Sequence, residues 1–334
     1  MMYRRRDLLR LGALAGTASG LGSRANAQLC EKEIGFGDIP IPISPPTRPF
    51  IQSLPIPPIL QPTAQLVPPP DPAAHQRYSD FMPKKFYELH AQEFKHSFHP
   101  DLPGPSTLWG YNGMCPGPTI VARYEEPILV RIHNDLPANH VGWGIPSIST
   151  HLHNMHSPWE SDGFPSHFAQ PTQFIDHHYV NYPAGGDFRE MLGTLWYHDH
   201  RQDYTAANVV RGLTAFYLLF NEFDNGTDRA GPKSLGLPAG DYDVSIILHD
   251  RSFDAAGEQI FDAFNTDGLL GDRYTLNDIV QPYFVVEPRK YRIRILNGGP
   301  SRFYRIALSA NQTFTLITSD GNLLPAPLSS TQLP

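Results

Sequence analysis

The residues best suited to chemistry are two histidine pairs, each of the form His-x-His: His151-Leu152-His153 and His198-Asp199-His200. Residues two apart in a β-strand point to the same face, so each pair offers two imidazoles on one side of a sheet. Four neutral imidazoles without a nearby thiolate suit copper, zinc, iron or nickel. A single such pair arises easily by chance among 15 histidines. Two pairs in one β-rich segment, however, predict a metal site.

The segment that contains both pairs resembles the first domain of the multicopper oxidases, in particular the bacterial laccase, bilirubin oxidase and spore-coat laccase branch. The matching features are the two pairs, the intervening Ser161-Asp162-Gly163-Phe164-Pro165, and Leu195-Trp196-Tyr197 before the second pair. Asp250-Arg251-Ser252-Phe253 and Ser319-Asp320-Gly321 match a second domain of the same family. The resemblance covers roughly residues 51–325.

This resemblance implies copper as the cofactor and a role for each histidine. His151 would bind the type 2 copper, His153 and His198 one type 3 copper, and His200 the other type 3 copper. Asp162 corresponds to an acidic residue that the family places near the copper cluster, which implies a role in proton relay. The alternative for Asp162 is a turn-forming residue before the glycine that follows it.

The same resemblance implies an O₂-reducing oxidase. Members of the family couple one-electron oxidation of phenols, aromatic amines, bilirubin-like pigments or metal ions to four-electron reduction of O₂ to water. They complete the copper site with a third domain that carries His-x-x-His-x-His and His-Cys-His segments, and neither segment occurs in this sequence. Cys30 and Cys115 lack the flanking histidines of a type 1 copper ligand. We therefore expect the N-terminal half of the trinuclear site, completed by a missing C-terminal domain or a partner chain.

Two other classes compete with an oxidase that is active by itself. One is a catalytically incomplete copper-binding or structural two-domain fragment, which fits the missing third domain. The other is a two-domain nitrite reductase or small laccase, but both need a blue-copper cysteine and histidine set that this chain lacks. Family resemblance favours the oxidase, whereas the 334-residue chain alone is expected to be inactive.

Length and composition set the frame for these motifs. A chain of 334 residues has room for about two domains. Its 34 prolines favour loops and short strands over long helices. A net charge of −7 argues against nucleic acid as a partner. Cys30 and Cys115 form either one disulfide or two free thiols, and spacing does not decide between them.

Residues 1–27 are typical of a twin-arginine export signal. Arg4-Arg5-Arg6 precedes an apolar, Gly-rich run, and Ala25-Asn26-Ala27 has the form of a cleavage site. An ordinary secretory signal or an uncleaved anchor is the alternative, but the apolar run is short for a span of about 20 residues. We expect a mature periplasmic or extracellular protein without a stable membrane anchor.

The remaining chain divides into four parts by composition. Residues 28–77 form a Pro-rich, extended arm, residues 78–222 the first domain, residues 223–240 a linker, and residues 241–334 a second, structural domain that ends early. Many short alternating segments with Gly and Pro turns predict an all-β protein with two Greek-key β-sandwich domains. The family resemblance implies that both are cupredoxin-like.

Several segments predict individual strands. They are 85–91, 128–134, 213–220, 244–249, 283–288, 290–297 and 314–319. Arg292 and Arg294 alternate with Ile293 and Ile295, which predicts a polar face and a face that packs. A further set of histidines lacks paired spacing, and we predict surface or locally hydrogen-bonded roles for them: His90, His96, His99, His133 and His140.

Overall fold

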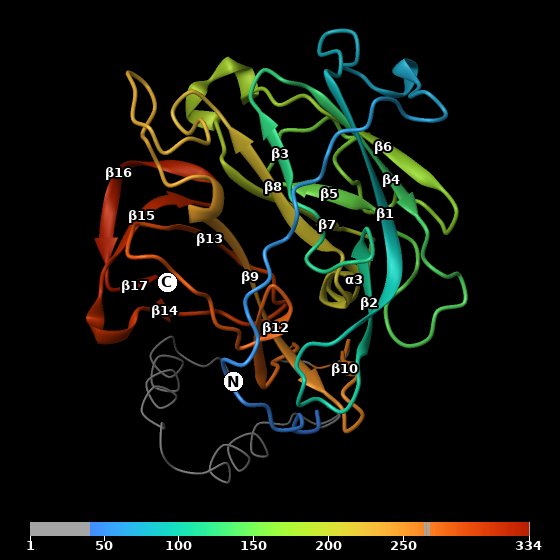
Figure 1. Cartoon of the computed structure of the whole chain (residues 1–334). Coiled ribbons are helices and arrows are strands. Elements are labelled where there is room, and N and C mark those ends of the chain that lie inside the picture. Colours follow the sequence, from blue (N-terminus) through green and yellow to red (C-terminus); the bar gives the residue numbers. More distant parts are fainter. Residues whose placement is uncertain (1–40, 264, 266–267, 334) are drawn as a thin grey trace, which may run out of the picture.

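The computed structural model describes residues 41–263, 265 and 268–333 (Figure 1). The predicted leader, Cys30 and the start of the predicted arm lie outside these residues. Within the described part, strands dominate and α3 (Thr205–Arg211) is the one α-helix, so the predicted all-β class is confirmed. None of the helices in this part is long and apolar enough to cross a membrane.

Two four-stranded sheets form a sandwich in the first half of the chain (Figure 1). The first sheet has the order β2 (Ser106–Tyr111), β1 (Lys85–His96), β4 (Ile128–Asn134), β6 (Phe174–Tyr179). The second sheet has the order β3 (Ile120–Arg123), β8 (Thr214–Phe220), β7 (Thr194–Asp199), β5 (Thr150–His153). The largest buried apolar cluster draws on both sheets, so the core lies between them.

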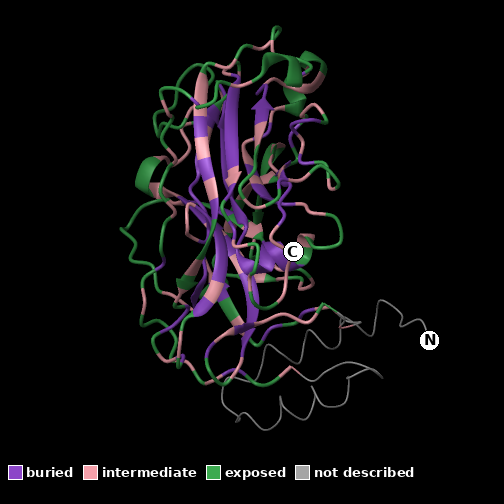
Figure 2. Cartoon of the chain, turned by 90° about the vertical axis from the view of Figure 1, so that its right-hand side faces the viewer, coloured by how far each residue is buried: buried purple, intermediate pink, exposed green. Residues whose placement is uncertain are grey.

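Side-chain alternation explains how the sandwich closes. On β1, Tyr87, Leu89 and Ala91 enter the core, so Glu88 and His90 point away from it. β8 is buried along its whole length and runs through the middle of its sheet. Figure 2 shows the buried strands in the interior, with exposed loops around them. Each sheet therefore has an apolar inner face and an outer face that can carry polar groups.

The second half of the chain is built on β9 (Asp243–Phe253). This strand pairs with β10 (Gln259–Ile260), β11 (Arg273–Leu276) and, in parallel, β13 (Arg292–Asn297), while β12 (Ile279–Val280) pairs with β11. Two smaller pairings follow, β15 (Phe314–Ser319) with β16 (Asn322–Ser330) and β14 (Ile306–Ala307) with β17 (Gln332–Leu333). Short 3₁₀ helices connect the strands: η1 (Pro72–Ala74), η2 (Ala184–Gly186), η3 (Phe188–Glu190), η4 (Gly240–Tyr242) and η5 (Ser309–Asn311).

The predicted faces of β13 are reversed in the structure. Arg292 and Arg294 are only 6% and 4% exposed, whereas Ile293 and Ile295 are 42% and 36% exposed. Arg292 pairs with Asp224 at 2.6 Å, and Arg294 pairs with the Asp243 carboxylate of β9 at 2.7 Å. Buried charges are tolerated when they are paired, so the carboxylates draw the arginines inward and leave the isoleucines outside.

The predicted strand over residues 283–288 is wrong. Tyr283 makes a single bridge to Ser53, and the residues after it form no ladder. Val285 is 78% exposed, so this side chain does not pack into a core. An apolar β-branched run becomes a strand only where it pairs with a neighbouring strand, so residue types alone do not decide the outcome.

The Pro-rich segment follows an extended path across both halves of the chain (blue in Figure 1). The Leu54 amide donates to the Tyr283 carbonyl in the second half, and the Leu60 and Thr63 amides donate to Thr119 and Phe86 in the first. Prolines prevent a continuous ladder, so the contacts are isolated bridges. The segment thereby ties the two halves together.

Candidate metal centre

Pairing of β5 with β7 brings the two His-x-His motifs together. In this antiparallel register His151 lies opposite His198, and His153 lies opposite Trp196. The intervening Leu152 and Tyr197 belong to the apolar core. The histidines therefore lie on the outer face of their sheet, on the side away from the core.

Four imidazoles gather at this place, and we call them the four-histidine cluster: His151, His153, His198 and His200. Candidate ligand atoms of the first three lie within 4.8 Å of one another. His153 Nδ1 and His198 Nε2 are 3.2 Å apart. The His200 ring lies 5.1 Å from the His151 ring and 5.9 Å from the His198 ring. All four predicted metal-ligand residues are thus neighbours.

Backbone carbonyls set the orientation of two of the rings. His151 Nδ1 donates to the Asp162 carbonyl at 2.5 Å, and His198 Nδ1 donates to the Asp199 carbonyl at 2.7 Å. Since a carbonyl can only accept, the proton of each neutral ring is on Nδ1. Nε2 of both rings is left with a lone pair, as a metal ligand requires.

The protonation state of the cluster also suits metal binding. Burial lowers the pKa of His198 to about 3, and the neighbouring imidazoles add to this effect. Partial desolvation, together with His151 and His200, lowers the pKa of His153 as well, although its ring is open to solvent. Both rings are therefore neutral near pH 7, when imidazole can bind a cation.

The donor set fits copper. The buried Nδ1 of His200 has no hydrogen-bond partner among the residues that the structure describes. The facing nitrogens of His153 and His198 lie about as far apart as two ligands of one ion, roughly 3.3 Å for a tetrahedral site with ~2 Å bonds. Imidazole ligands without thiolate suit copper or zinc.

Asp199 holds the surroundings of the cluster in place. Its buried carboxylate accepts hydrogen bonds from the Ser149 amide at 2.8 Å, the Arg201 amide at 3.1 Å and the Asn208 side chain at 2.9 Å. These donors belong to the residue before β5, the loop after β7, and α3. Burial raises the pKa of Asp199 to about 7, against the opposite effect of the three donors.

The loop after β5 places Asp162 beside His151. The carboxylate Oδ1 lies 3.6 Å from His151 Nδ1, and this side chain is 37% exposed. Its backbone carbonyl, rather than its carboxylate, makes the short hydrogen bond. Gly163 follows with φ +80°, and a Cβ at this position would overlap Thr150 and His151. The tight approach therefore depends on glycine.

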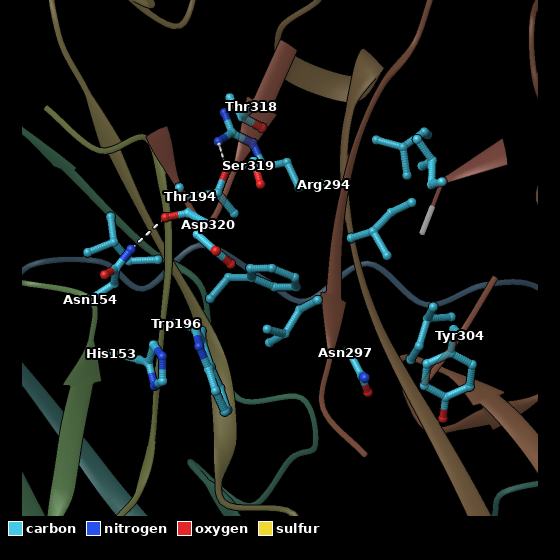
Figure 3. Close-up of a pocket in the computed structure, with 18 of the residues that line it drawn as sticks. His153, Asn154, Thr194, Trp196, Arg294, Asn297, Tyr304, Thr318, Ser319 and Asp320 are labelled. Atoms are coloured by element: carbon cyan, nitrogen blue, oxygen red, sulfur yellow. Dashed lines mark hydrogen bonds between the residues drawn. The ribbon is translucent and has the colours of Figure 1, made fainter. Parts of the chain in front are cut away.

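A pocket of about 860 Å³ opens beside His153 (Figure 3). Trp196 forms part of its wall and stacks on His198 with ring centroids 3.9 Å apart. The turn between β15 and β16 closes one side, because the Asn154 side chain donates to the Asp320 carbonyl at 2.5 Å. The pocket thus lies between the four-histidine cluster and the second half of the chain.

Three further residues, two of them close to the histidine pairs in the sequence, are not part of the four-histidine cluster. Tyr197 is buried and donates to the Pro118 carbonyl at 2.5 Å, whereas His156 lies at the surface near Glu190. Cys115 is a buried thiol that donates to Asp278 at 2.5 Å, and burial raises its pKa well above the usual range. Cys30 lies outside the described residues.

The structure also brings together residues that sequence reasoning left apart. Glu88, His90 and His133 meet on the outer face of the other sheet, with candidate ligand atoms within 4.8 Å of one another. By contrast, His96 and His99 each contact a backbone carbonyl from a distant part of the chain. In the sequence, the cluster of Glu88, His90 and His133 could be found only from a Glu-x-His pattern on one predicted strand and a His-x-Asp pattern at the end of another.

Comparisons with known proteins point to one family. Residues 95–221 match a family model described as multicopper oxidase. The chain is 32% identical to a laccase of Bacillus subtilis (strain 168), covering 83% of this chain and 54% of the laccase. It is also 32% identical to a bilirubin oxidase of Albifimbria verrucaria, over 87% of this chain and 46% of the bilirubin oxidase. The chain thus spans about half the length of these relatives.

A solved structure of a multi-copper oxidase from Pediococcus acidilactici superposes with a TM-score of 0.68 and 25% identity, over 89% of this chain and 55% of that one. This similarity and those to other multicopper oxidase structures confirm the predicted two-domain cupredoxin-like fold. The family model, the sequence relatives and the fold all indicate the same family. The chain therefore belongs to the multicopper oxidase family.

Proposed function

We propose that this chain carries the N-terminal half of the copper centre of a laccase-like oxidase. His151 would hold the type 2 copper, His153 and His198 one type 3 copper, and His200 the other. The observation that carries the proposal is the 3.2 Å approach of His153 Nδ1 to His198 Nε2. Two lone pairs at this distance repel each other unless a proton or a cation lies between them.

Copper, when bound, supplies the one-electron chemistry that couples oxidation of a reductant to reduction of O₂ to water. The reductants that fit the family are phenols, aromatic amines, bilirubin-like pigments and metal ions. The chain's own residues orient the ligands: the Asp162 and Asp199 carbonyls hold the rings of His151 and His198. The Asp162 carboxylate, which is partly open to solvent and lies 3.6 Å from His151, would pass protons to the site.

We further propose that a C-terminal domain or a partner chain supplies the remaining ligands. The sequence contains no His-Cys-His segment, and four histidines are too few for three copper ions. The pocket beside His153 is lined by apolar as well as polar side chains, and the apolar Phe303 among them is 96% exposed. An exposed apolar patch of this kind favours burial against another protein surface.

Copper stoichiometry and oxygen uptake test the proposal together. The purified chain is loaded with copper, dialysed and analysed by elemental analysis, and oxygen uptake is measured with a simple phenol. We expect about one to two tightly held copper ions per chain and no sustained uptake by this chain alone. His167→Ala, which changes an exposed histidine outside the cluster, should leave the copper content unchanged.

Two results would contradict the proposal. Copper content that is equal in the parent and in a His153→Ala/His198→Ala variant would place copper elsewhere. Sustained oxygen uptake by the isolated chain would show that no further domain or partner is needed. A chain that holds copper but gains no activity with any C-terminal partner would instead support the copper-binding fragment.

A further inference from the structure

A second cluster of metal-ligating side chains lies on the outer face of the first sheet. Glu88 and His90 are two residues apart on β1, so both point away from the core. β1 and β4 are parallel neighbours, and their register places His90 directly beside His133. Asp135, two residues after His133, joins them. We call these four residues the histidine–carboxylate cluster.

Short contacts organise this cluster. His90 Nδ1 lies 2.7 Å from Asp135 Oδ2, and His133 Nε2 lies 2.8 Å from Glu88 Oε1. The two imidazole rings stack with centroids 4.5 Å apart and planes 5° from parallel. Candidate ligand atoms of Glu88, His90 and His133 lie within 4.8 Å of one another.

We propose that the histidine–carboxylate cluster is a binding site for a divalent first-row transition metal of the Zn²⁺ class. Asp135 holds Nδ1 of His90, which leaves Nε2 of that ring as the ligand, in the arrangement that metal-binding histidines commonly share. The ion replaces the proton between His133 Nε2 and Glu88. Two imidazoles and one carboxylate suit Zn²⁺, whereas Mg²⁺ and Ca²⁺ prefer oxygen ligands alone.

The surroundings allow the ligands to close around an ion. Ligands of a tetrahedral ion with ~2 Å bonds lie about 3.3 Å apart, so the side chains must move inward and the rings must turn out of their stack. The side chains of His90 and Glu88 are 39% and 35% exposed, which leaves room for this rotation. The paired strands below keep the backbone in register.

Charge at the cluster also favours a cation. Glu88 and Asp135 contribute two negative charges beside two imidazoles. The one arginine that the described contacts place nearby on this face, Arg131, is buried and paired with Asp176 at 2.7 Å. Its positive charge is therefore compensated. Phe174 packs against the His133 ring, 5.4 Å between centroids, and covers one side of the cluster.

This site is separate from the four-histidine cluster. His90 and His133 lie on the outer face of the β2-β1-β4-β6 sheet, whereas the four-histidine cluster lies on the outer face of the opposite sheet. The apolar core of the sandwich lies between the two faces. An ion at one cluster thus shares no ligand with an ion at the other.

Zinc titration of the full chain tests the proposal. His153→Ala/His198→Ala serves as the background, so that the four-histidine cluster does not contribute to the heat. In this background we expect about one Zn²⁺ per chain by calorimetry, and a loss of affinity of more than about a hundredfold after His90→Ala/His133→Ala. His167→Ala, the matched control, should bind as the background does.

Two conservative variants sharpen the test. Glu88→Gln removes a ligand while keeping its shape, and we expect a similar loss of affinity. Asp135→Asn removes only the group that orients His90, and we expect a smaller loss of about tenfold. Thermal unfolding without metal checks that each variant folds. Tetrahedral Co²⁺ absorption, lost in Glu88→Gln, identifies the ligands independently of heat.

Zinc binding that is unchanged in both Glu88→Gln and His90→Ala/His133→Ala would overturn the proposal. So would a binding event that His167→Ala removes equally, because that result would mean general surface binding. Absence of any Zn²⁺ binding to the His153→Ala/His198→Ala variant would also overturn the proposal. None of these outcomes depends on the oxidase function.

Discussion

The two metal-ligating clusters of this protein use the same strand geometry but differ in what holds their rings. Both bring histidines of two neighbouring strands together on the outer face of a sheet, one across an antiparallel pair and one across a parallel pair. In the four-histidine cluster, backbone carbonyls hold His151 and His198. In the histidine–carboxylate cluster, Asp135 and Glu88 side chains hold His90 and His133.

This difference separates a preorganised site from an adjustable one. A backbone carbonyl moves only with its strand or loop, so it keeps a ring in one tautomer and one orientation. Carboxylate side chains rotate and also carry charge, so they can become ligands themselves. We therefore expect the four-histidine cluster to depend on the fold around it, and the histidine–carboxylate cluster to depend on its own four side chains.

The largest effect should follow from removing the facing nitrogens of the four-histidine cluster. We expect His153→Ala/His198→Ala to lower copper affinity by more than about a hundredfold, because two ligands of the same ion are lost. Competition with a chelator of known affinity measures this change. His90→Ala/His133→Ala should leave this copper event intact. If it instead abolished the event, the two clusters would not be independent.

A change in the loop behind His151 should destabilise the fold. In Gly163→Ala, the new Cβ would overlap Thr150 and His151, so we expect a loss of about 2–4 kcal/mol in the free energy of unfolding. Gly185→Ala is the matched control. It also has positive φ but open space around it, and should cost about 1 kcal/mol. Urea unfolding measures the free energy of unfolding of both variants. An equal loss in the two would contradict the close approach of Gly163 to Thr150 and His151.

His177 tests whether a backbone-held histidine influences stability without any metal. It is buried on β6, Nδ1 donates to the Ser161 carbonyl at 3.0 Å, and burial lowers its pKa to about 4. The folded state resists its protonation, so stability is full above pH ~6.5 and falls as the pH drops toward 4. The expected loss is on the order of 3 kcal/mol.

His177→Gln should flatten this part of the pH profile, because glutamine can donate to the Ser161 carbonyl but does not titrate. Unfolding free energies measured between pH 7 and 4 give the slope in metal-free protein. His167→Gln, an exposed position, should keep the parent slope. Identical slopes for His177→Gln and the parent would show that His177 is not the group that titrates.

The smallest effect should come from the histidine–carboxylate cluster in the absence of metal. Glu88 is 35% exposed and contacts a partly exposed histidine, so Glu88→Gln should change the free energy of unfolding by less than about 1 kcal/mol. Asp176→Asn on the same sheet is the comparison, since it leaves the buried Arg131 without its partner and should cost more. Urea unfolding measures both variants. Equal losses in the free energy of unfolding would mean that the Glu88–His133 contact stabilises the fold as much as the buried Arg131–Asp176 pair does.

Much of the fold and the candidate site could be predicted from the sequence. The alternation over residues 128–134 predicted a strand with the bounds that β4 has. The two His-x-His pairs predicted imidazoles on one face, and all four rings are neighbours. The Pro-rich segment after residue 40 is extended in the structure. These features depend on residue types and short spacings along the chain.

The prediction failed where distant residues decide the outcome. Alternation on β13 defined two faces, but Asp224 and Asp243 determined that the arginines, rather than the isoleucines, are buried. The run over residues 283–288 has strand-forming side chains, but among the described residues it makes only the bridge between Tyr283 and Ser53. His90 and His133 carried no paired spacing, and only the register of β1 with β4 makes them neighbours.

The sequence by itself determined which side chains share a face of a strand, because successive Cβ atoms point to opposite sides of the backbone. It also determined the family and the four candidate copper ligands. Only the tertiary structure decided which face is buried, which strands pair and which histidines meet across a sheet. These outcomes depend on the free energy of pairing and burying groups that are far apart in the chain.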